Sequence, residues 1–286
     1  AAIEHLVPQV ADLHRVRALD LAPLLDEEIG EWQARLEWDF RPSADLVRRY
    51  VALESLAGYA LLAGGAVAGY TYLVSDDGKG LIGDLFVSAA ARRPETDFLL
   101  LKAALDDLLV RSSVRRVESQ LMMLASGGTG EVPYEQWLRR HPRNYMTIGL
   151  GKVFGLKPGP AARSAQIETW SAPRLEEAAE VIAQAYSGHV DGDVNDQYLS
   201  VKGARRFLNN LMQYPGCGSF FQPASLVAVD AWTGRACGVS LASILSQGVG
   251  HITQICVAPA LKGRGLGYEL LRRSLLALAE AGCRRA

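Results

Sequence analysis

The sequence predicts an α/β protein built from two tandem copies of one fold. The main observation is an internal repeat: Gly83–Val87 overlays Thr253–Val257 at an offset of 170 residues, and the residues after each segment fall into line. The strands before them, Ala66–Val74 and Ala236–Leu245, overlay at an offset of 169. Each pair of strands is followed by an apolar pattern at helical spacing. The chain has 286 residues, which is enough for two domains of ordinary size.

The most informative stretch is the second of these repeats, from Gly250 to Gly282. His251–Val257 is a short run of apolar and β-branched residues, which predicts a buried strand. After Pro259 the sequence reads Lys-Gly-Arg-Gly-Leu-Gly over 262–267, and from Tyr268 onward leucines recur at helical spacing. The pattern therefore predicts a strand, a glycine-rich turn and a long helix in direct succession.

A glycine-rich turn that opens a helix is suited to bind an anion. The first N–H groups of a helix have no partner within the helix and point outward at the positive end of its dipole. Glycines let the backbone approach a phosphate closely, and Lys262 and Arg264 add positive charge beside it.

Two known glycine motifs and a structural turn without a ligand are the alternatives for this segment. A phosphate-binding loop of the Walker type needs Lys followed by Ser or Thr, which is absent. The dinucleotide fingerprint needs G-x-G-x-x-G, but position 268 is tyrosine, so the spacing does not fit. A structural turn without a ligand is the remaining alternative.

At these residues the sequence resembles the GCN5-related N-acetyltransferase (GNAT) superfamily. The signature of that family is a strand ending in V-x-P, followed by Q/R-x-x-G-x-G/A at the start of a long helix. Val257-Ala258-Pro259 and 262–267 match it, with Lys262 in place of Gln or Arg. The resemblance implies two tandem acyl-CoA N-acyltransferase domains, each a mixed, mostly antiparallel sheet flanked by helices.

The resemblance also implies a function and a set of binding residues. The protein is expected to transfer an acetyl group from acetyl-CoA to a primary amine of a small molecule or peptide. The alternative is a non-catalytic acyl-CoA-binding or regulatory module. Acetyl-CoA is expected to contact the end of the strand and the loop that follows, through Ile255, Cys256, Val257, Lys262, Gly263, Arg264, Gly265, Leu266, Gly267 and Tyr268.

The residues expected to act on the amine are less strongly indicated. Some family members carry a base six residues before the signature valine, where this chain has His251, whose side chain has a suitable ordinary pKa. An ordinary surface histidine is the alternative. Asp191, Asp193 and Asp196 are expected to attract a cationic amine, or to form only a solvated acidic loop. Their spacing does not fit a calcium loop, no metal is expected, and no general acid can be assigned.

The first copy departs from the signature where the phosphate would bind. Arg93, Glu95 and Asp97 stand where the second copy has its three glycines, and Pro94 stands at the position of Arg264. Two carboxylates repel a phosphate, and a proline removes an N–H donor. The first copy is therefore expected not to bind CoA phosphates and to have a structural role.

The remaining elements follow from periodicity and from proline and glycine positions. In the first copy we expect a strand at Ile3–Val7, helices at Ala11–Asp20, Asp26–Trp38, Asp45–Leu53 and Phe98–Val110, a hairpin within Ser55–Ser75, a strand at Arg116–Leu124, a short helix at Pro133–Arg140 and strands within Tyr145–Leu156. In the second copy we expect strands at Ala165–Trp170, Leu226–Asp230 and Ala236–Leu245, and helices at Arg174–Tyr186 and Lys202–Gln213.

Prolines and a glycine at 157–160 mark the expected domain boundary. The predicted domains are 1–158, degenerate, and 163–286, which binds acetyl-CoA. The strand after the first copy's long helix would have its counterpart near position 287, so the second copy is expected to lack its last strands in this chain.

Composition narrows the class of protein. The net charge of −1 argues against a broad basic face for nucleic acid. The four cysteines have no C-x-x-C spacing, which is typical of reduced thiols in a cytoplasmic protein. Ser55–Ser75 carries no charge and is long enough to cross a bilayer, but its central Gly64-Gly65 favours two strands and a tight turn. We therefore expect no membrane partner; the oligomeric state is not predicted.

Overall fold

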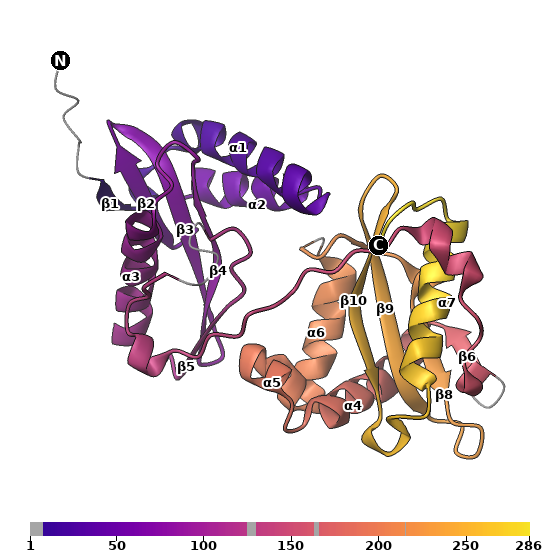
Figure 1. The fold of residues 1–286 in the computed structure, drawn as a ribbon. Helices are drawn as coiled ribbons and strands as arrows, with labels where there is room; N and C mark the ends of the chain where they lie inside the picture. The colour runs from indigo at the N-terminus through magenta and orange to yellow at the C-terminus, as the bar shows by residue number, and fades with distance from the viewer. Residues whose placement is uncertain (1–7, 125–129, 163–165, 215) are drawn as a thin grey trace. The chain divides into compact units, whose positions relative to one another are not determined.

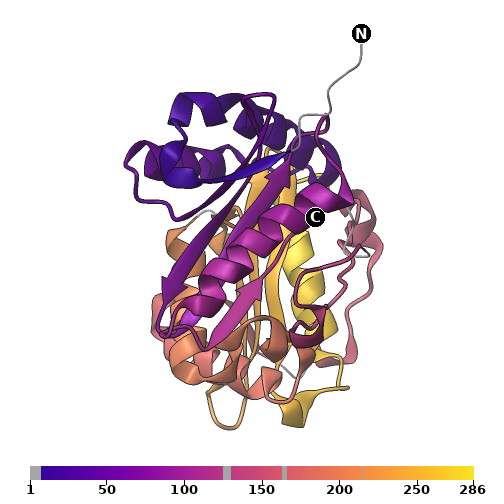
Figure 2. The same cartoon turned by 90° about the vertical axis from the view of Figure 1, so that its left-hand side faces the viewer.

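The structure is a computed structural model that describes residues 8–124, 130–162, 166–214 and 216–286. The chain forms two compact units. The first comprises Ala1–Ala34 and Phe40–Arg143, and the second comprises Arg35–Asp39 and Asn144–Ala286. Figures 1 and 2 show the two sheets and the helices that belong to each.

The first unit is a five-stranded sheet in the order β1-β2-β3-β4-β5, antiparallel except for the parallel pair β4 and β5. Helix α3 covers one face, where Leu100 contacts Gly69, while the neighbouring Tyr70 points to the other face and to α1. The elements are β1 (Gln9–Asp12), α1 (Ala18–Leu36), α2 (Arg41–Ala52), β2 (Gly58–Ala63), β3 (Ala66–Asp76), β4 (Lys79–Val87), α3 (Pro94–Val110) and β5 (Arg116–Ser119).

The second unit repeats this arrangement with the sheet order β10-β9-β8-β6 and a short strand β7 beside β9. Helix α7 packs on one face, and α4 and α6 pack on the other (Figure 1). The elements are β6 (Gln166–Thr169), α4 (Leu175–Tyr186), α5 (Val190–Val194), α6 (Val201–Gln213), β7 (Ser219–Phe220), β8 (Leu226–Val229), β9 (Ala236–Ser246), β10 (Val249–Val257) and α7 (Leu266–Glu280).

Strand pairing confirms the internal repeat and explains its two offsets. Gly69 pairs with Val87 in the first unit, and Gly238 pairs with Val257 in the second. Both β3–β4 and β9–β10 carry an irregularity just before the residue pairs Tyr72–Asp84 and Leu241–Gln254. The β9–β10 pair has one further irregularity, between Val249 and Gly250. A bulge adds one residue to a strand, which accounts for the change from 169 to 170.

The parallel pairing at the end of each repeat also corresponds. In the first unit Lys79 pairs with Arg116, and in the second Val249 forms a parallel bridge with Arg285. Pairing of β4 with β5 stops at Ile82, so the rest of β4 leaves the neighbouring strand. β10 likewise lies at the end of its sheet.

Several predicted elements are wrong or shifted. Only Ala18–Asp20 of the predicted helix Ala11–Asp20 are α-helical, as the start of α1; the residues before them form the end of β1 and a 3-10 turn, because Asp12 caps that turn through the N–H of His14. Only Glu135–Trp137 is helical within the predicted short helix, and Tyr145–Leu156 holds no strand but a 3-10 segment, Leu150–Gly155. The predicted strand Ile3–Val7 lies outside the described residues.

The compact units divide earlier than the expected domain boundary at 158–163. Residues after Asn144 pack with the second unit, where the N–H groups of Ile148 and Leu150 donate to the carbonyl oxygens of Ala286 and Arg284, both at 2.8 Å. The limits 1–158 and 163–286 stay a prediction about the sequence repeat.

The uncharged segment Ser55–Ser75 forms the predicted hairpin, because β2 and β3 pair on either side of Gly64 and Gly65. Both glycines have positive φ, which a tight hairpin turn requires. Within the described part of the chain, no helix is both long enough and apolar enough to cross a membrane.

A buried acid pair lies between α1 and β4 of the first unit. The Glu28 carboxylate accepts hydrogen bonds from Tyr70 Oη at 2.8 Å and Trp32 Nε1 at 3.2 Å. Asp84 lies against it, and both side chains are buried. Burial raises the pKa of Glu28 well above its ordinary value and that of Asp84 to about 6.

We expect Asp84→Asn to raise the stability of the first unit, compared with wild type, more at pH 7 than at pH 4. The folded protein binds the Asp84 proton more tightly than the unfolded chain, so this group's contribution is present at low pH and is lost as pH rises towards 6. Asn cannot ionise. Thermal midpoints of both proteins between pH 4 and 8 test this: the variant's midpoint should gain on wild type as pH rises, and a constant difference contradicts a buried, titrating Asp84.

Candidate functional site

The glycine loop of the second unit joins β10 to α7 as predicted. β10 ends at Val257, a 3-10 turn spans Pro259–Leu261, and α7 begins at Leu266. Gly263 and Gly265 have φ of 77° and 81°, the left-handed region that favours glycine. Gly265 is the N-cap residue and supplies no side-chain hydrogen bond. The first N–H groups of α7 therefore depend on solvent or a ligand for a partner.

The loop is open on its outer side. Lys262, Gly263 and Arg264 are exposed, whereas Leu266 is only 5% exposed and anchors the helix in the core. Lys262 Nζ donates to the carbonyl oxygen of Ala185 at 3.4 Å. Two cations thus lie beside a helix N-terminus that solvent can reach, which is the geometry of an anion site.

Residues 157–161 hold the first turn of α7 from one side. Tyr268 Oη donates to the carbonyl oxygen of Lys157 at 2.8 Å, and the Gly159 N–H donates to Glu269 Oε2 at 3.2 Å. A Cβ on Gly265 would lie 3.0 Å from Pro160 Cγ. The expected binding residue Tyr268 therefore has a structural partner for its hydroxyl.

The outer edge of β10 presents main-chain groups beside the loop. The Ala258 N–H donates to Cys237 O on β9, so Ala258 and Cys256 direct their main-chain groups inward to the sheet. By the alternation of a strand, Ile255 and Val257 direct theirs outward. The Cys256 side chain is buried in the core, and burial raises its pKa to about 12. Its thiol therefore stays protonated and does not act as a nucleophile.

His251 lies near the start of β10, four residues from Ile255 and therefore roughly 13 Å along the strand. Its ring stacks on Tyr145, with centroids 6.2 Å apart, and lies 5.5 Å from Trp38 in the same unit. Burial lowers its pKa to about 4, so the imidazole is neutral at pH 7 and is a weak base. His251 therefore lies at the end of β10 that is farther from the glycine loop.

The acidic segment forms short helices beside α4. His189 caps α5, accepting from the Asp191 N–H at 3.2 Å, and its ring lies 5.4 Å from that of Tyr186. Asp193 is exposed, whereas Asp191 and Asp196 are half-buried. The carboxylates therefore border an aromatic group in which Tyr186 and Tyr198 stack at 4.7 Å and Tyr198 meets Phe207 at 5.1 Å.

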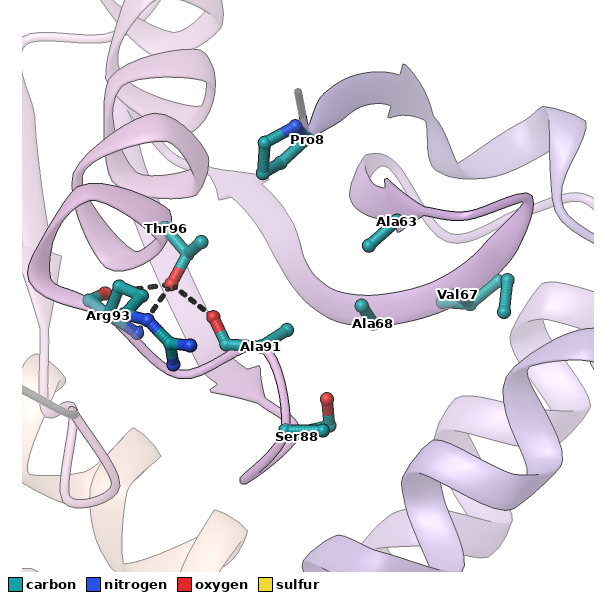
Figure 3. Close-up of a pocket in the computed structure, with 10 residues that line it drawn as sticks. Pro8, Ala63, Val67, Ala68, Ser88, Ala91, Arg93 and Thr96 are labelled. Carbon is teal, nitrogen blue, oxygen red and sulfur yellow. Dashed lines mark hydrogen bonds between the residues drawn. The ribbon is translucent and has the colours of Figure 1, made fainter. Parts of the chain in front are cut away.

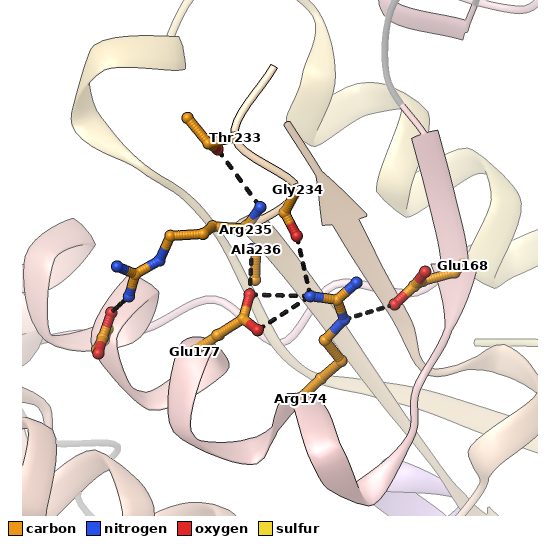
Figure 4. A network of polar contacts seen from close by, with 8 residues as sticks. Glu168, Arg174, Glu177, Thr233, Gly234, Arg235 and Ala236 are labelled. Atoms are coloured by element: carbon orange, nitrogen blue, oxygen red, sulfur yellow. Dashed lines mark hydrogen bonds and ion pairs between the residues drawn. The ribbon is translucent and has the colours of Figure 1, made fainter. Parts of the chain in front are cut away.

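The N-terminal end of α4 is held by polar contacts to β6 and to the start of β9, as Figure 4 shows. Arg174 donates to Glu168 at 2.7 Å, to Glu177 at 2.9 Å and to the carbonyl oxygen of Gly234 at 3.1 Å. Glu177 also accepts the Ala236 N–H at 2.6 Å, which lowers its pKa. These contacts hold α4 on β6 and β9, so the position of Tyr186 at its other end is well defined.

The first unit builds the corresponding region differently. Its helix α3 starts with Pro94, and Arg93 and Thr96 form a capping box. Arg92, the counterpart of Lys262, donates to the carbonyl oxygen of Val87 at 3.0 Å and pairs with Glu31 at 2.6 Å. The helix end and its cation are therefore satisfied within the protein.

A cavity of about 580 Å³ lies next to this capped helix in the first unit (Figure 3). Small apolar residues, including Ala63, Ala68 and Ala91, form most of its wall, with Arg93 and Thr96 at one end. Thr96 Oγ1 accepts the Arg93 N–H at 3.0 Å and donates to Arg93 O at 2.7 Å. The polar groups at this end of the cavity thus bond to one another, and no glycine loop lies there to bind a phosphate.

Sequence reasoning missed several residues of the second unit's site. Tyr186 and Gln254 meet across the sheet face, with Tyr186 Oη donating to Gln254 Oε1 at 3.2 Å. Glu269 is fully buried between Arg272 and Arg273, both at 2.7 Å. A glutamine within an apolar strand was the one signal available for Gln254. Within the described residues, no group of three or more His, Cys, Asp or Glu side chains is placed to hold a metal.

The two units share one strand order, and in the second unit a glycine loop opens a helix after an edge strand. This arrangement is the acyl-CoA N-acyltransferase class of fold. The structure of a GCN5-related N-acetyltransferase from Sphaerobacter thermophilus is similar over 98% of this chain and 84% of its own, at 16% identity and a TM-score of 0.57. A tandem GNAT protein from the clavulanic acid biosynthesis pathway is similar over 98% of this chain and 88% of its own, at 15% identity and a TM-score of 0.53.

A third structure is the glucosamine N-acetyltransferase region of a fungal multi-domain GH3 β-N-acetylglucosaminidase. It is similar over all of this chain and 35% of its own, at 14% identity and a TM-score of 0.56. No curated protein matches the sequence. Residues 195–286 match the sequence model of the acetyltransferase (GNAT) family. The matched residues lie in the second unit, and the chain as a whole has the tandem GNAT fold.

Proposed function

We propose that the second unit transfers an acetyl group from acetyl-CoA to a primary amine of a small molecule or peptide. The observation that carries this is the exposed loop 262–265, whose two left-handed glycines lead into the uncapped N-terminus of α7 beside the open edge of β10. The pyrophosphate would bind the free N–H groups of the helix start, with Lys262 and Arg264 beside it. The acyl arm would pair with the outward main-chain groups of Ile255 and Val257.

The amine would approach from the face covered by α4 and α6. Asp191, Asp193 and Asp196 supply negative charge there for a cationic acceptor. The net charge of −1 does not favour nucleic acid as acceptor, and four free cysteines suit the reducing cytoplasm.

Turnover and binding assays separate this proposal from a binding module. The purified chain is mixed with acetyl-CoA and a panel of primary amines, and free CoA thiol is followed together with calorimetric binding. Release of thiol that depends on the amine supports the enzyme. Binding without turnover supports a non-catalytic acyl-CoA module, and neither binding nor turnover rejects both.

We expect His251→Gln to lower kcat roughly 100-fold if His251 is the base that takes the amine proton, because positioned bases contribute at least that much. The affinity for acetyl-CoA should not change, since His251 lies away from the loop. Its imidazole resonances should titrate near pH 4 in NMR spectra, because burial opposes the charged form. An unchanged kcat removes His251 from the mechanism, and a midpoint near 6.5 contradicts its burial.

A further inference from the structure

The hydroxyl of Tyr186 reaches the edge of β10. Tyr186 is the last residue of α4 and is 9% exposed. Its Oη donates to Gln254 Oε1 at 3.2 Å and lies 3.4 Å from the carbonyl oxygen of Ile255. That carbonyl belongs to the outward-facing main-chain groups of the strand, so the hydroxyl lies where a group pairing with the strand edge would arrive.

Gln254 is placed to hold this hydroxyl. Its side chain is 5% exposed, and its Nε2 is buried without a hydrogen-bond partner in the structure. A buried, unpaired amide donor destabilises the folded protein. A side chain with this cost indicates that its unpaired donor has a use in the bound state.

Other candidate O–H and S–H donors near the strand are differently placed. Tyr268 Oη donates to Lys157 O on the opposite side of the sheet from α4. Tyr198 stacks on Tyr186, and its hydroxyl pairs with the Asn195 side chain. The Cys256 thiol is in the core. Among these donors, Tyr186 is therefore the one whose hydroxyl contacts the main chain of β10.

We propose that Tyr186 is a catalytic residue whose single O–H turns from Gln254 Oε1 to the thioester carbonyl oxygen of bound acetyl-CoA. Gln254 is its positioning residue, because its amide turns so that the unpaired Nε2 donates to the phenol oxygen. This assignment rests on the proposed acetyl transfer. When the amine nitrogen bonds to the carbonyl carbon, the π electron pair moves to the oxygen, and Tyr186 stabilises that negative charge. The C=O bond then reforms as the C–S bond breaks with its pair on sulfur.

The proton count of this step is balanced without the tyrosine. The nitrogen loses one proton to a base or to water, and the sulfur gains one from water, so the products are an amide and free CoA thiol. Tyr186 keeps its proton throughout. Burial raises the pKa of the Tyr186 phenol above its ordinary value. A raised pKa suits a hydrogen-bond donor that never ionises and does not suit an acid that transfers its proton.

Tyr186→Phe tests the assignment and keeps the ring that packs on Tyr198. We expect kcat to fall roughly 10²–10³-fold, as on loss of one oxyanion donor, with the affinity for acetyl-CoA unchanged. Tyr198→Phe, the matched control, should stay near wild type. Gln254→Met should lower kcat less than Tyr186→Phe, and the double variant should be no slower than Tyr186→Phe alone, because the two residues act as a unit.

A spectroscopic measurement separates catalysis from a structural role. Difference infrared spectra of acetyl-CoA labelled with ¹³C at the acetyl carbonyl should show a lower carbonyl frequency when bound to wild type and to Tyr198→Phe than to Tyr186→Phe. Equal frequencies in all three, or a kcat for Tyr186→Phe near wild type, overturn this assignment alone. Equal loss of kcat in both tyrosine variants also overturns it. If wild type does not bind acetyl-CoA, the proposed function fails as well.

Discussion

Replacing Gly263 by aspartate should weaken acetyl-CoA binding at least roughly tenfold, while replacing it by asparagine should change the affinity by less than about threefold. Gly263 has φ of 77°, and a Cβ built on it meets nothing within 4 Å. Asp and Asn both tolerate left-handed backbone better than other side chains, and they have nearly the same size. The pair therefore differs in charge and in one NH2 donor group, and binding of an anion is weakened by the carboxylate but not by the amide.

Calorimetric titration of both variants with acetyl-CoA measures this difference, with unfolding midpoints as the check on stability. Equal affinities in the Asp and Asn proteins would mean that the phosphates bind elsewhere. Gly265→Glu, which copies the first repeat, is a poorer test. Gly265 has φ of 81° and its Cβ would crowd Pro160, so any side chain there strains the fold as well as the site.

Glu269→Gln should lower the free energy of unfolding of the second unit by roughly 2–3 kcal/mol at pH 7. Arg272 and Arg273 hold the pKa of this fully buried carboxyl at about 2, below its ordinary 4.5. A depressed pKa contributes stability above pH 4.5, and the contribution is lost as pH falls from 4.5 towards 2. Glutamine keeps the shape but removes the charge that pairs with both arginines.

Urea unfolding at pH 7 and at pH 3 measures this effect. The difference between wild type and variant should be large at pH 7 and smaller at pH 3. Glu280→Gln, at the exposed end of the same helix, is the control and should stay within about 0.5 kcal/mol of wild type. Equal stabilities at pH 7 would show that the Glu269 ion pairs do not hold the first turn of α7.

The sequence predicted what depends on local pattern. The glycine loop was predicted from the spacing of glycine, proline and apolar residues around Val257 and Leu266. This pattern is local and can be recognised without knowing any distant contact. The repeat was visible because the strands β3–β4 and β9–β10 pair in the same register, and a one-residue bulge changed the offset without hiding it.

The errors arose where distant contacts decide the structure. The main-chain N–H groups of Ile148 and Leu150 donate hydrogen bonds to residues at the end of the chain. The apolar segment that suggested strands therefore forms a 3-10 turn and no strand. Tyr186 and Gln254 are 68 residues apart, and only the folded sheet brings them together. Burial of His251 likewise depends on Tyr145, which no local pattern predicted.

The most direct test of the account is a titration of ¹⁵N-labelled protein with acetyl-CoA, followed by the backbone amide shifts. The account predicts the largest shifts at the amides of Gly263–Tyr268, with further shifts at Ile255 and Val257. Larger shifts at Arg93 and Thr96 beside the cavity of the first unit, or none in the loop at saturating acetyl-CoA, would contradict it.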